Sequence, residues 1–162
     1  MSVRVVSKDH GYAKMRANLK AAAKGGGVSV GVHAAEGAAQ AKGSSEAEPA
    51  TVLDVAYYNE FGLGVPERSF LRAWVDENAS VNADKLRKAM QLVVKGQKTL
   101  PEALALLGLS FQGGIQKNMA VGIPPPNAPA TVAKKGSSTP LVDTGQLRQS
   151  ITFQVRDKPP TG

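Results

Sequence analysis

Residues 99–119 combine a strong helix start signal with a long apolar stripe, and this constrains the fold most. Thr99 and Glu102 have the spacing of a capping box, with Pro101 at an early helical position. The stripe that follows consists of Leu104, Leu107, Phe111, Ile115 and Met119. We therefore expect a helix near 100–119 with one face buried in the core.

Three glycines interrupt this stripe. Gly108, Gly113 and Gly114 lie inside the expected helix, where each costs about 1 kcal/mol relative to alanine. We expect that a closely packed neighbour requires them. Another backbone could approach the helix there.

Three further helices are predicted, near 9–24, 51–61 and 68–95. Asp9 can cap the first, which carries an apolar stripe of Tyr12, Met15 and Leu19. Thr51 and Asp54 have capping-box spacing at the start of the second, and Gly62 can close it in a left-handed conformation. The third could be interrupted at 78–80. Its expected buried residues are Phe70, Trp74, Val81, Leu86 and Val93.

Alternating residues predict short strands near 3–6, 28–33 and 150–156. In the second strand, the valines lie on one face, and Ser29, Gly31 and His33 lie on the other. This places His33 on the polar side of a strand in preference to a ligand site. The expected fold class is α+β, with a small mixed or antiparallel sheet packed against three to four helices.

Two segments lack any core pattern. Residues 34–50 are rich in Ala, Gly, Ser and Glu, which favours a flexible loop. Residues 121–140 contain five prolines, which predicts a long extended arm. With 162 residues, 42% of them hydrophobic, the chain can form one modest core, so 1–162 is expected to be a single domain.

Composition narrows the possible chemistry. The chain has no cysteine and only two histidines, His10 and His33, which leaves little for metal or thiolate chemistry. We expect no cofactor, no metal site and no enzymatic activity. No apolar run reaches the roughly 18 residues that span a bilayer, and the N-terminus lacks the apolar region of a signal peptide, so we expect a protein kept in the cytoplasm.

The tripeptide Asp143-Thr144-Gly145 resembles an aspartic protease loop, in which two such aspartates activate water. A retroviral-type protease subunit needs most of its sheet after this loop, and only 17 residues follow Gly145. We therefore interpret Asp143 as the cap of a helical turn at 144–149. Phosphate-binding motifs are also incomplete.

The chain has a net charge of +7, and its charged residues are distributed unevenly along the sequence. Residues 1–24 carry six Lys/Arg and one acid, residues 34–60 carry one and five, and residues 117–162 carry six and two. Such a chain can meet nucleic acid, but it also offers complementary faces to copies of itself. A DNA-binding packaging accessory protein therefore stays open as an alternative.

Four segments in a fixed order resemble a known family. They are NEFG at 59–62, PERSFLR at 66–72, PPNAP at 125–129 and PLVDTGQL at 140–147. Together with the intervening helix, they resemble the bacteriophage minor tail, or tail completion (neck), family that includes phage lambda tail protein Z and its prophage relatives. The similarity covers residues 51–75 and 109–153, about two fifths of the chain.

The resemblance implies a structural virion protein at the head-tail junction of a tailed bacteriophage, present in the host cytoplasm during assembly. It implies a role in tail assembly and head-tail joining as a homo-oligomeric ring of about six subunits. Expected partners are the connector or head-closure protein, the tail terminator and the tail tube, with non-specific contact to genomic DNA in the lumen. A tail terminator ring protein is the alternative within the same class.

Two sets of site residues follow. The interface candidates are Glu67, Arg68 and Arg72, and in the arm Pro124, Pro125, Pro126, Asn127, Pro129, Lys134 and Lys135. The structural motif comprises Asn59, Glu60, Phe61, Gly62, Phe70, Asp143, Thr144, Gly145, Leu147 and Ile151.

Within the motif, Asn59 and Glu60 are expected to make hydrogen bonds at a helix end. We expect Phe61, Phe70, Leu71, Leu147 and Ile151 in the core. Deleting 123–139 is expected to abolish assembly and to leave the monomer folded.

Overall fold

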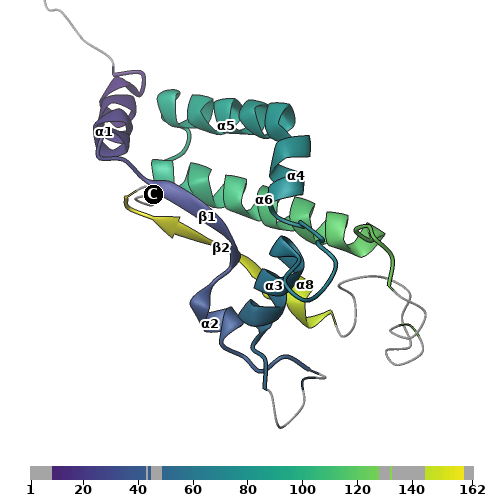
Figure 1. Cartoon of the computed structure of the whole chain (residues 1–162). Coiled ribbons are helices and arrows are strands. Elements are labelled where there is room, and N and C mark those ends of the chain that lie inside the picture. The colour runs from purple at the N-terminus through teal and green to yellow at the C-terminus, as the bar shows by residue number, and fades with distance from the viewer. Residues whose placement is uncertain (1–8, 43, 45–48, 128–131, 133–144, 159–162) are drawn as a thin grey trace, which may run out of the picture.

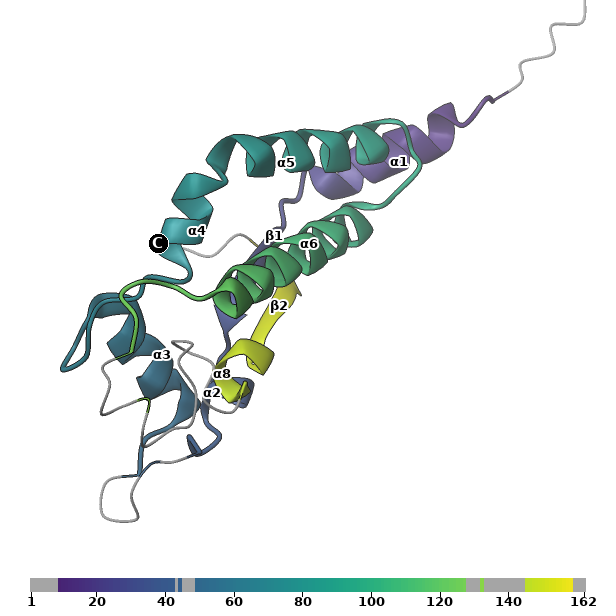
Figure 2. The same ribbon diagram turned by 90° about the vertical axis from the view of Figure 1, so that its right-hand side faces the viewer.

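A long central helix separates a small sheet from a second helix in the computed structural model, which describes residues 9–42, 44, 49–127, 132 and 145–158. Helix α6 (Leu100–Val121) contacts both strands on one side and α5 (Ala79–Val94) on the other. Figure 1 and Figure 2 show these three layers, with α1 and α3 near opposite ends of the molecule. The predicted strand near 3–6 lies outside the described residues.

The sheet has two antiparallel strands among the described residues, β1 (Gly27–Val32) and β2 (Ile151–Arg156). Val30 pairs with Phe153 and Val32 with Ile151, so the apolar side chains of both strands share one face. This confirms the predicted α+β class and the pairing of the segments near 28–33 and 150–156.

Helix α6 begins with the predicted capping box. The Thr99 hydroxyl accepts a hydrogen bond from the Glu102 N–H, and the Glu102 carboxylate accepts one from the Thr99 N–H. Four of the five predicted stripe residues are buried, namely Leu104, Leu107, Ile115 and Met119, and Phe111 is half-buried.

Two of the three α6 glycines have the predicted close neighbour. A Cβ at Gly108 would lie 2.4 Å from Phe153 Cδ2, and a Cβ at Gly114 would lie 2.3 Å from Trp74 Cζ2. Both neighbours are aromatic side chains, where we had suggested a backbone. Gly113 has no atom within 4 Å of its Cβ position, so the prediction is wrong there.

The segment near 68–95 forms two helices instead of one. Helix α4 (Arg72–Glu77) ends at Asn78, where α5 begins, which is within the predicted interruption. The predicted burial of Val81 and Leu86 is wrong, since they are 51% and 47% exposed. The reason is that α5 packs mainly on α6, so only its Ala89 and Val93 side is covered.

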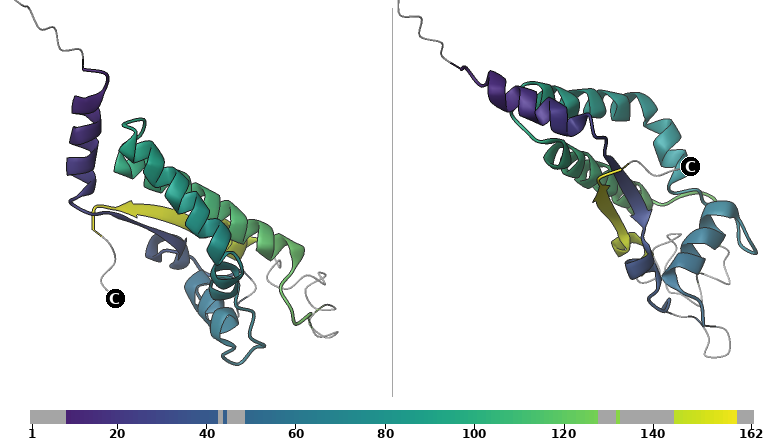
Figure 3. Two further views of the ribbon diagram at one scale, coloured as in Figure 1. Left: turned by 90° about the horizontal axis from the view of Figure 1, so that it is seen from above. Right: turned by 90° about the vertical axis from the view of Figure 1, so that its left-hand side faces the viewer.

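Helix α1 (Tyr12–Ala22) begins later than predicted, with Gly11 at its N-cap position, but the Asp9 carboxylate does accept hydrogen bonds from the N–H groups of Tyr12 and Ala13. Its apolar stripe is not buried in the core. Tyr12 is 64% exposed and Leu19 is 40% exposed, and no residue of α1 is fully buried. Figure 3 shows that α1 projects beyond the sheet.

Part of the predicted loop 34–50 has regular structure. Residues Ala34–Gly37 form the short helix α2, and Gln40 forms a β-bridge with Thr51. Gly37 allows this helix to pack closely, since a Cβ there would lie 3.0 Å from Leu53 Cβ. Composition alone did not reveal this contact.

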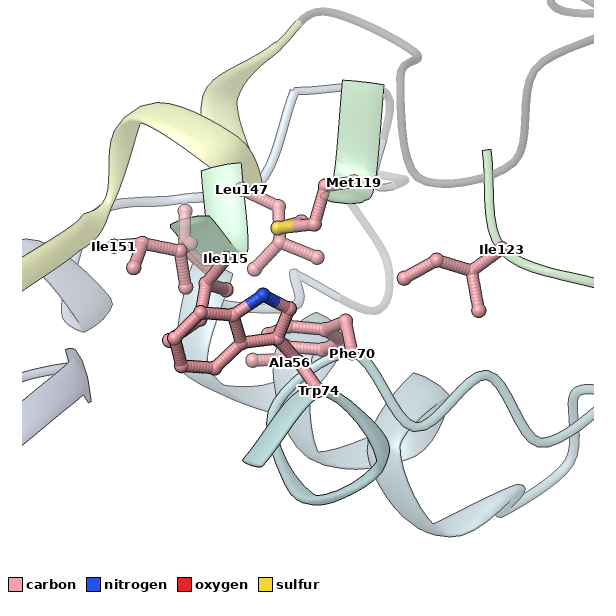
Figure 4. Close-up of a cluster of buried hydrophobic side chains, with 9 residues drawn as sticks. Ala56, Phe70, Trp74, Ile115, Met119, Ile123, Leu147 and Ile151 are labelled. Carbon is pink, nitrogen blue, oxygen red and sulfur yellow. The ribbon is translucent and has the colours of Figure 1, made fainter. Parts of the chain in front are cut away.

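The main hydrophobic core joins segments that are distant in sequence. Helices α3 (Val52–Phe61) and α8 (Gln146–Gln149) pack there beside α4, α6 and β2 (Figure 4). Its buried members are Val52, Ala56, Phe70, Trp74, Ile115, Met119, Ile123, Leu147 and Ile151. The core positions predicted for Phe70, Leu147 and Ile151 are therefore confirmed, and Leu71 packs against the cluster while half-buried. None of the described helices combines the length and the hydropathy that a membrane-spanning helix requires.

Candidate functional site

The turn between α3 and α4 is held by one buried carboxylate. Glu60 is 5% exposed. Its Oε2 accepts hydrogen bonds from the N–H groups of Phe70 and Leu71 at 2.9 and 3.0 Å. Its Oε1 accepts hydrogen bonds from the Ser69 hydroxyl at 2.8 Å and from the Arg72 N–H and Nε at 3.0 and 3.1 Å. We call this arrangement the Glu60 clasp.

The Glu60 clasp provides hydrogen-bond acceptors for N–H groups at the start of α4. The first N–H groups of a helix have no partner inside the helix, and α4 has no side-chain cap of its own. Glu60, from a different helix, accepts from the N–H groups of Leu71 and Arg72, and the Ser69 hydroxyl accepts from the N–H of Ala73. Burial raises the pKa of Glu60, but hydrogen bonds from Arg72, Leu71 and Ser69 outweigh burial and keep the pKa below its usual value. The predicted structural role of Glu60 is confirmed.

Asn59 and Gly62 complete the end of α3. The Asn59 side chain donates to the Val55 carbonyl, and the Asn59 carbonyl accepts from the Arg68 N–H at 2.7 Å. Gly62 has φ +70°, and a Cβ there would lie 2.9 Å from Glu67 Cβ. Glycine is therefore required both by the left-handed backbone and by the close approach.

Arg72 joins the clasp to an aromatic pair. One of its nitrogens donates to the Glu60 carbonyl at 2.6 Å and to the Glu67 carboxylate at 3.0 Å. Its guanidinium carbon lies 4.6 Å from the centroid of the Phe61 ring, and the Tyr57 ring lies 4.8 Å from that centroid. Phe61 is 47% exposed, so its predicted core position is wrong. The side of α3 that carries Val52, Ala56 and Glu60 faces the core, and Phe61 does not belong to it.

Six large apolar residues of this region are exposed by 39–53%. They are Leu53, Tyr57, Tyr58, Phe61, Leu63 and Val65. We call this set the α3 apolar surface. Within this set, the Tyr57 and Phe61 rings are in contact, and aromatic residues and arginine are enriched at protein interfaces.

The sequence carries a signal for this surface. Residues 52–61 are apolar around most of the helix circumference. A short helix at the edge of a domain buries only one side, so the excess of apolar residues had to be exposed or covered by a partner.

Arg68 is not the exposed cation that its interface prediction assumed, because it is 7% exposed. Its Nε donates to the Pro125 carbonyl at 2.9 Å, and Nη2 donates at 3.4 Å to both the Pro126 carbonyl and Asn127 Oδ1. Burial lowers the pKa of Arg68. Arg68 therefore fixes the start of the proline-rich segment from within the same chain.

The contacts of Arg68 bear on which part of the proline-rich segment can be deleted without affecting the fold. Ile123 is 9% exposed and belongs to the main core, and the residues that follow it bind Arg68. Removing 123–139 would take Ile123 out of the main core and leave Arg68 without these partners, so we now expect that deletion to destabilise the monomer. Pro124, Pro125 and Pro126 are themselves exposed. The other predicted arm residues, Pro129, Lys134 and Lys135, lie outside the described residues.

Only part of the segment Asp143-Thr144-Gly145 lies within the described residues. Gly145 has φ +68° at the start of α8, and the Asp143 and Thr144 predictions lie outside the described residues.

His33 follows β1, and its two ring nitrogens hydrogen-bond the hydroxyls of Ser29 and Thr152, both at 2.9 Å. The predicted strand therefore ends one residue early, because His33 is the N-cap residue of α2, although its ring does lie on the side of Ser29 and Thr152.

An open pocket of about 420 Å³ lies between α6 and α8, lined by Gly113, Gln116, Lys117, Ala120, Arg148 and Gln149. The Gln116 side-chain amide donates to the carbonyls of Arg148 and Ile151, both at 3.1 Å, so it has a structural use. Within the described ranges, no group of three or more His, Cys, Asp or Glu residues could hold a metal ion.

Comparison of the chain with protein-family models, with curated proteins and with solved structures found no match.

Proposed function

We propose that this chain is a non-enzymatic structural protein of a tailed bacteriophage particle. In this proposal it is a tail completion or neck component at the head-tail junction. It acts in tail assembly and head-tail joining as a homo-oligomeric ring, in contact with other neck and tail proteins.

The observation that carries this proposal is the α3 apolar surface together with the clasp that holds it. Glu60 fixes the turn through the backbone N–H groups of three successive residues. The apolar side chains beside it remain uncovered in the single chain. A rigid surface of exposed aromatic and aliphatic groups is suited to binding another protein.

The location of this surface agrees with the resemblance that suggested the proposal. NEFG at 59–62 forms the end of α3, and PERSFLR at 66–72 contains the other half of the clasp. Phe70 and Leu147, which come from two different segments of the resemblance, meet in the main core. The described parts of these segments therefore contribute to one connected core.

The test is the location and copy number of the chain in particles produced from the genome that encodes it. Quantitative mass spectrometry of purified particles should find it at a fixed copy number, and electron microscopy should place it where head and tail meet. Without the gene, heads and tails should accumulate unjoined. Its absence from purified particles would contradict the proposal.

Two variants refine the test. Deleting 128–139 keeps Ile123 and the Arg68 partners, so the monomer should fold and particle assembly should fail. Asp143→Asn should leave assembly unchanged, because the proposal gives that carboxylate no catalytic role. Loss of particle maturation in Asp143→Asn would instead favour a protease.

A further inference from the structure

We infer that the pocket between α6 and α8 binds a phosphate group of a nucleic-acid backbone, with Lys117 and Arg148 as its two cationic contacts. This goes beyond the proposed function, which names only protein partners. The argument uses the charges of the pocket, the rigidity of its backbone, one glycine and the chemistry of its lining.

The two cations of this pocket are available to a ligand. Lys117 is exposed on α6, and Arg148 is half-buried on α8. Over the described residues, neither side chain makes an ion pair or a hydrogen bond. The only acidic residue on these two helices is Glu102, about 22 Å along the helix axis from Lys117, and it does not line the pocket. The pocket therefore has a positive potential that attracts anions.

The backbone around this pocket is held in place by the fold. The Gln116 side chain on α6 donates to the carbonyls of Arg148 and Ile151, and so joins α6 to the segment that carries the second cation. Leu147, next to Arg148, is buried in the main core. Figure 2 shows α8 beside α6. A ligand would therefore bind without a rearrangement of the backbone, which lowers the entropy that binding costs.

Gly113 leaves space in the pocket. Glycine inside a helix is destabilising relative to alanine. Its neighbour Gly114 is required by Trp74, but a Cβ at Gly113 would have no atom within 4 Å. Packing against the described residues therefore gives no reason for a glycine at 113. Because Gly113 lines the pocket, a side chain there would occupy space that a ligand would use.

The lining favours a phosphate backbone over a protein segment. It consists of glycine, alanine, glutamine, lysine and arginine. Protein interfaces depend on aromatic and other large apolar anchors, and a base needs an aromatic side chain on which to stack; neither kind of residue lines this pocket. Lysine and arginine donate to phosphate oxygens, and such contacts supply binding that is independent of sequence.

The experiment measures binding of the full-length chain to a fluorescently labelled DNA duplex. Fluorescence anisotropy between about 50 and 200 mM salt gives the affinity and its salt dependence. Lys117→Gln and Arg148→Gln each remove one cation of the pocket. Lys88→Gln is the matched control, since Lys88 is exposed on α5 and does not line the pocket. Circular dichroism should show all three variants folded.

The wild type should bind duplexes of unrelated sequence equally, with an affinity that falls as salt is added. At the lowest salt, each pocket variant should bind about fivefold more weakly, which corresponds to the loss of one exposed ion pair. The slope of log affinity against log salt should become shallower by about 0.9 in each, the value for one phosphate contact. Lys88→Gln should keep the wild-type slope.

Two variants of Gly113 test the pocket without removing a cation. Gly113→Glu places a carboxylate one helical turn before Lys117, where it can pair with that lysine and repel a phosphate. Gly113→Gln adds a side chain of the same size without the charge. Both should fold, because glutamate and glutamine favour a helix more than glycine does. Gly113→Glu should weaken DNA binding at least as much as Lys117→Gln, and Gly113→Gln should weaken it less.

Four results would overturn the inference. They are a wild type that does not bind at about 50 mM salt, an unchanged slope in either pocket variant, an equal loss in Lys88→Gln, and equal binding by the two Gly113 variants. A poly-glutamate peptide offers the other anionic chemistry. If it binds the wild type as tightly as the duplex does and loses affinity in the pocket variants, the pocket belongs to an acidic protein segment.

Failure of this inference can be told apart from failure of the proposed function. If the chain is found at the head-tail junction but does not bind DNA through Lys117 and Arg148, the function stands and the phosphate site is wrong. If the pocket variants lose DNA binding as expected but the chain is missing from particles, the phosphate site stands and the phage role is wrong.

Discussion

Replacing Glu60 by glutamine should cost much of the stability of the fold. The substitution keeps the shape but turns one acceptor oxygen into an N–H donor. If the amide nitrogen replaces Oε2, it faces the N–H groups of Phe70 and Leu71; if it replaces Oε1, it faces the N–H and Nε of Arg72. At least two hydrogen bonds to a charged group are lost, each worth about 1.5–3 kcal/mol.

We expect Glu60→Gln to lower the free energy of unfolding by about 3–5 kcal/mol, the range seen when a buried ion pair loses one member. Urea unfolding at neutral pH measures this directly, and the thermal midpoint should fall on the order of 10 °C. Glu67→Gln is the matched control, because it removes only a pair whose Glu67 side chain is 59% exposed, worth less than about 1 kcal/mol. Equal losses in the two variants, or less than about 1 kcal/mol for Glu60→Gln, would refute the role assigned to the clasp.

Three further predictions concern stability. The pKa of Glu60 is lowered in the folded chain, so wild type should exceed Glu60→Gln in free energy of unfolding by the full amount at neutral pH. This difference should shrink as the pH falls below the ordinary value of 4.5, and urea unfolding across that range measures it. A difference that grows in acid would contradict the prediction. Gly114→Ala should destabilise by about 1–3 kcal/mol through overlap with Trp74, while Gly113→Ala, with open space around it, should stabilise by about 0.5–1 kcal/mol; thermal unfolding compares them, and equal shifts would contradict the packing argument. Arg68→Met should cost about 1.5–3 kcal/mol in urea unfolding, because the carbonyls that Arg68 binds lose their donor; no measurable loss would show that the attachment is dispensable.

Local signals in the sequence predicted most elements of this fold. The capping boxes at Thr51 and Thr99 gave the starts of α3 and α6 correctly, because both partners of a cap lie within one helical turn. Alternation of valines in β1 and of Ile151 and Phe153 in β2 predicted the sheet. These interactions involve neighbours in sequence or a simple period.

Burial on the helices was harder to predict. Periodicity identifies an apolar side of a helix, but whether this side is covered depends on where the other elements lie. Val81 and Leu86 lie on α5 where α6 does not reach, and Tyr12 lies on a helix that projects from the domain. The prediction that Val81 and Leu86 are buried failed for this reason, and the apolar stripe that includes Tyr12 is exposed for the same reason.

The contacts of the candidate site also depend on the tertiary structure. Glu60 binds N–H groups that follow it by ten to twelve residues, across a turn whose path depends on Gly62. Arg68 binds a carbonyl 57 residues further along the chain. No local pattern marks either contact, so Arg68 was expected to be a surface charge.

The Glu60 clasp also affects how fast a partner could associate. Phe61 adjoins the clasp residue, so the α3 apolar surface acquires its shape when the single chain folds. An interface formed there would lose little additional backbone entropy, and its association rate should be set by diffusion and charge, with no slow rearrangement. Glu60→Gln weakens the clasp, so it should lower the rate at which a partner binds the α3 apolar surface. This effect should be seen under conditions in which the chain is still folded.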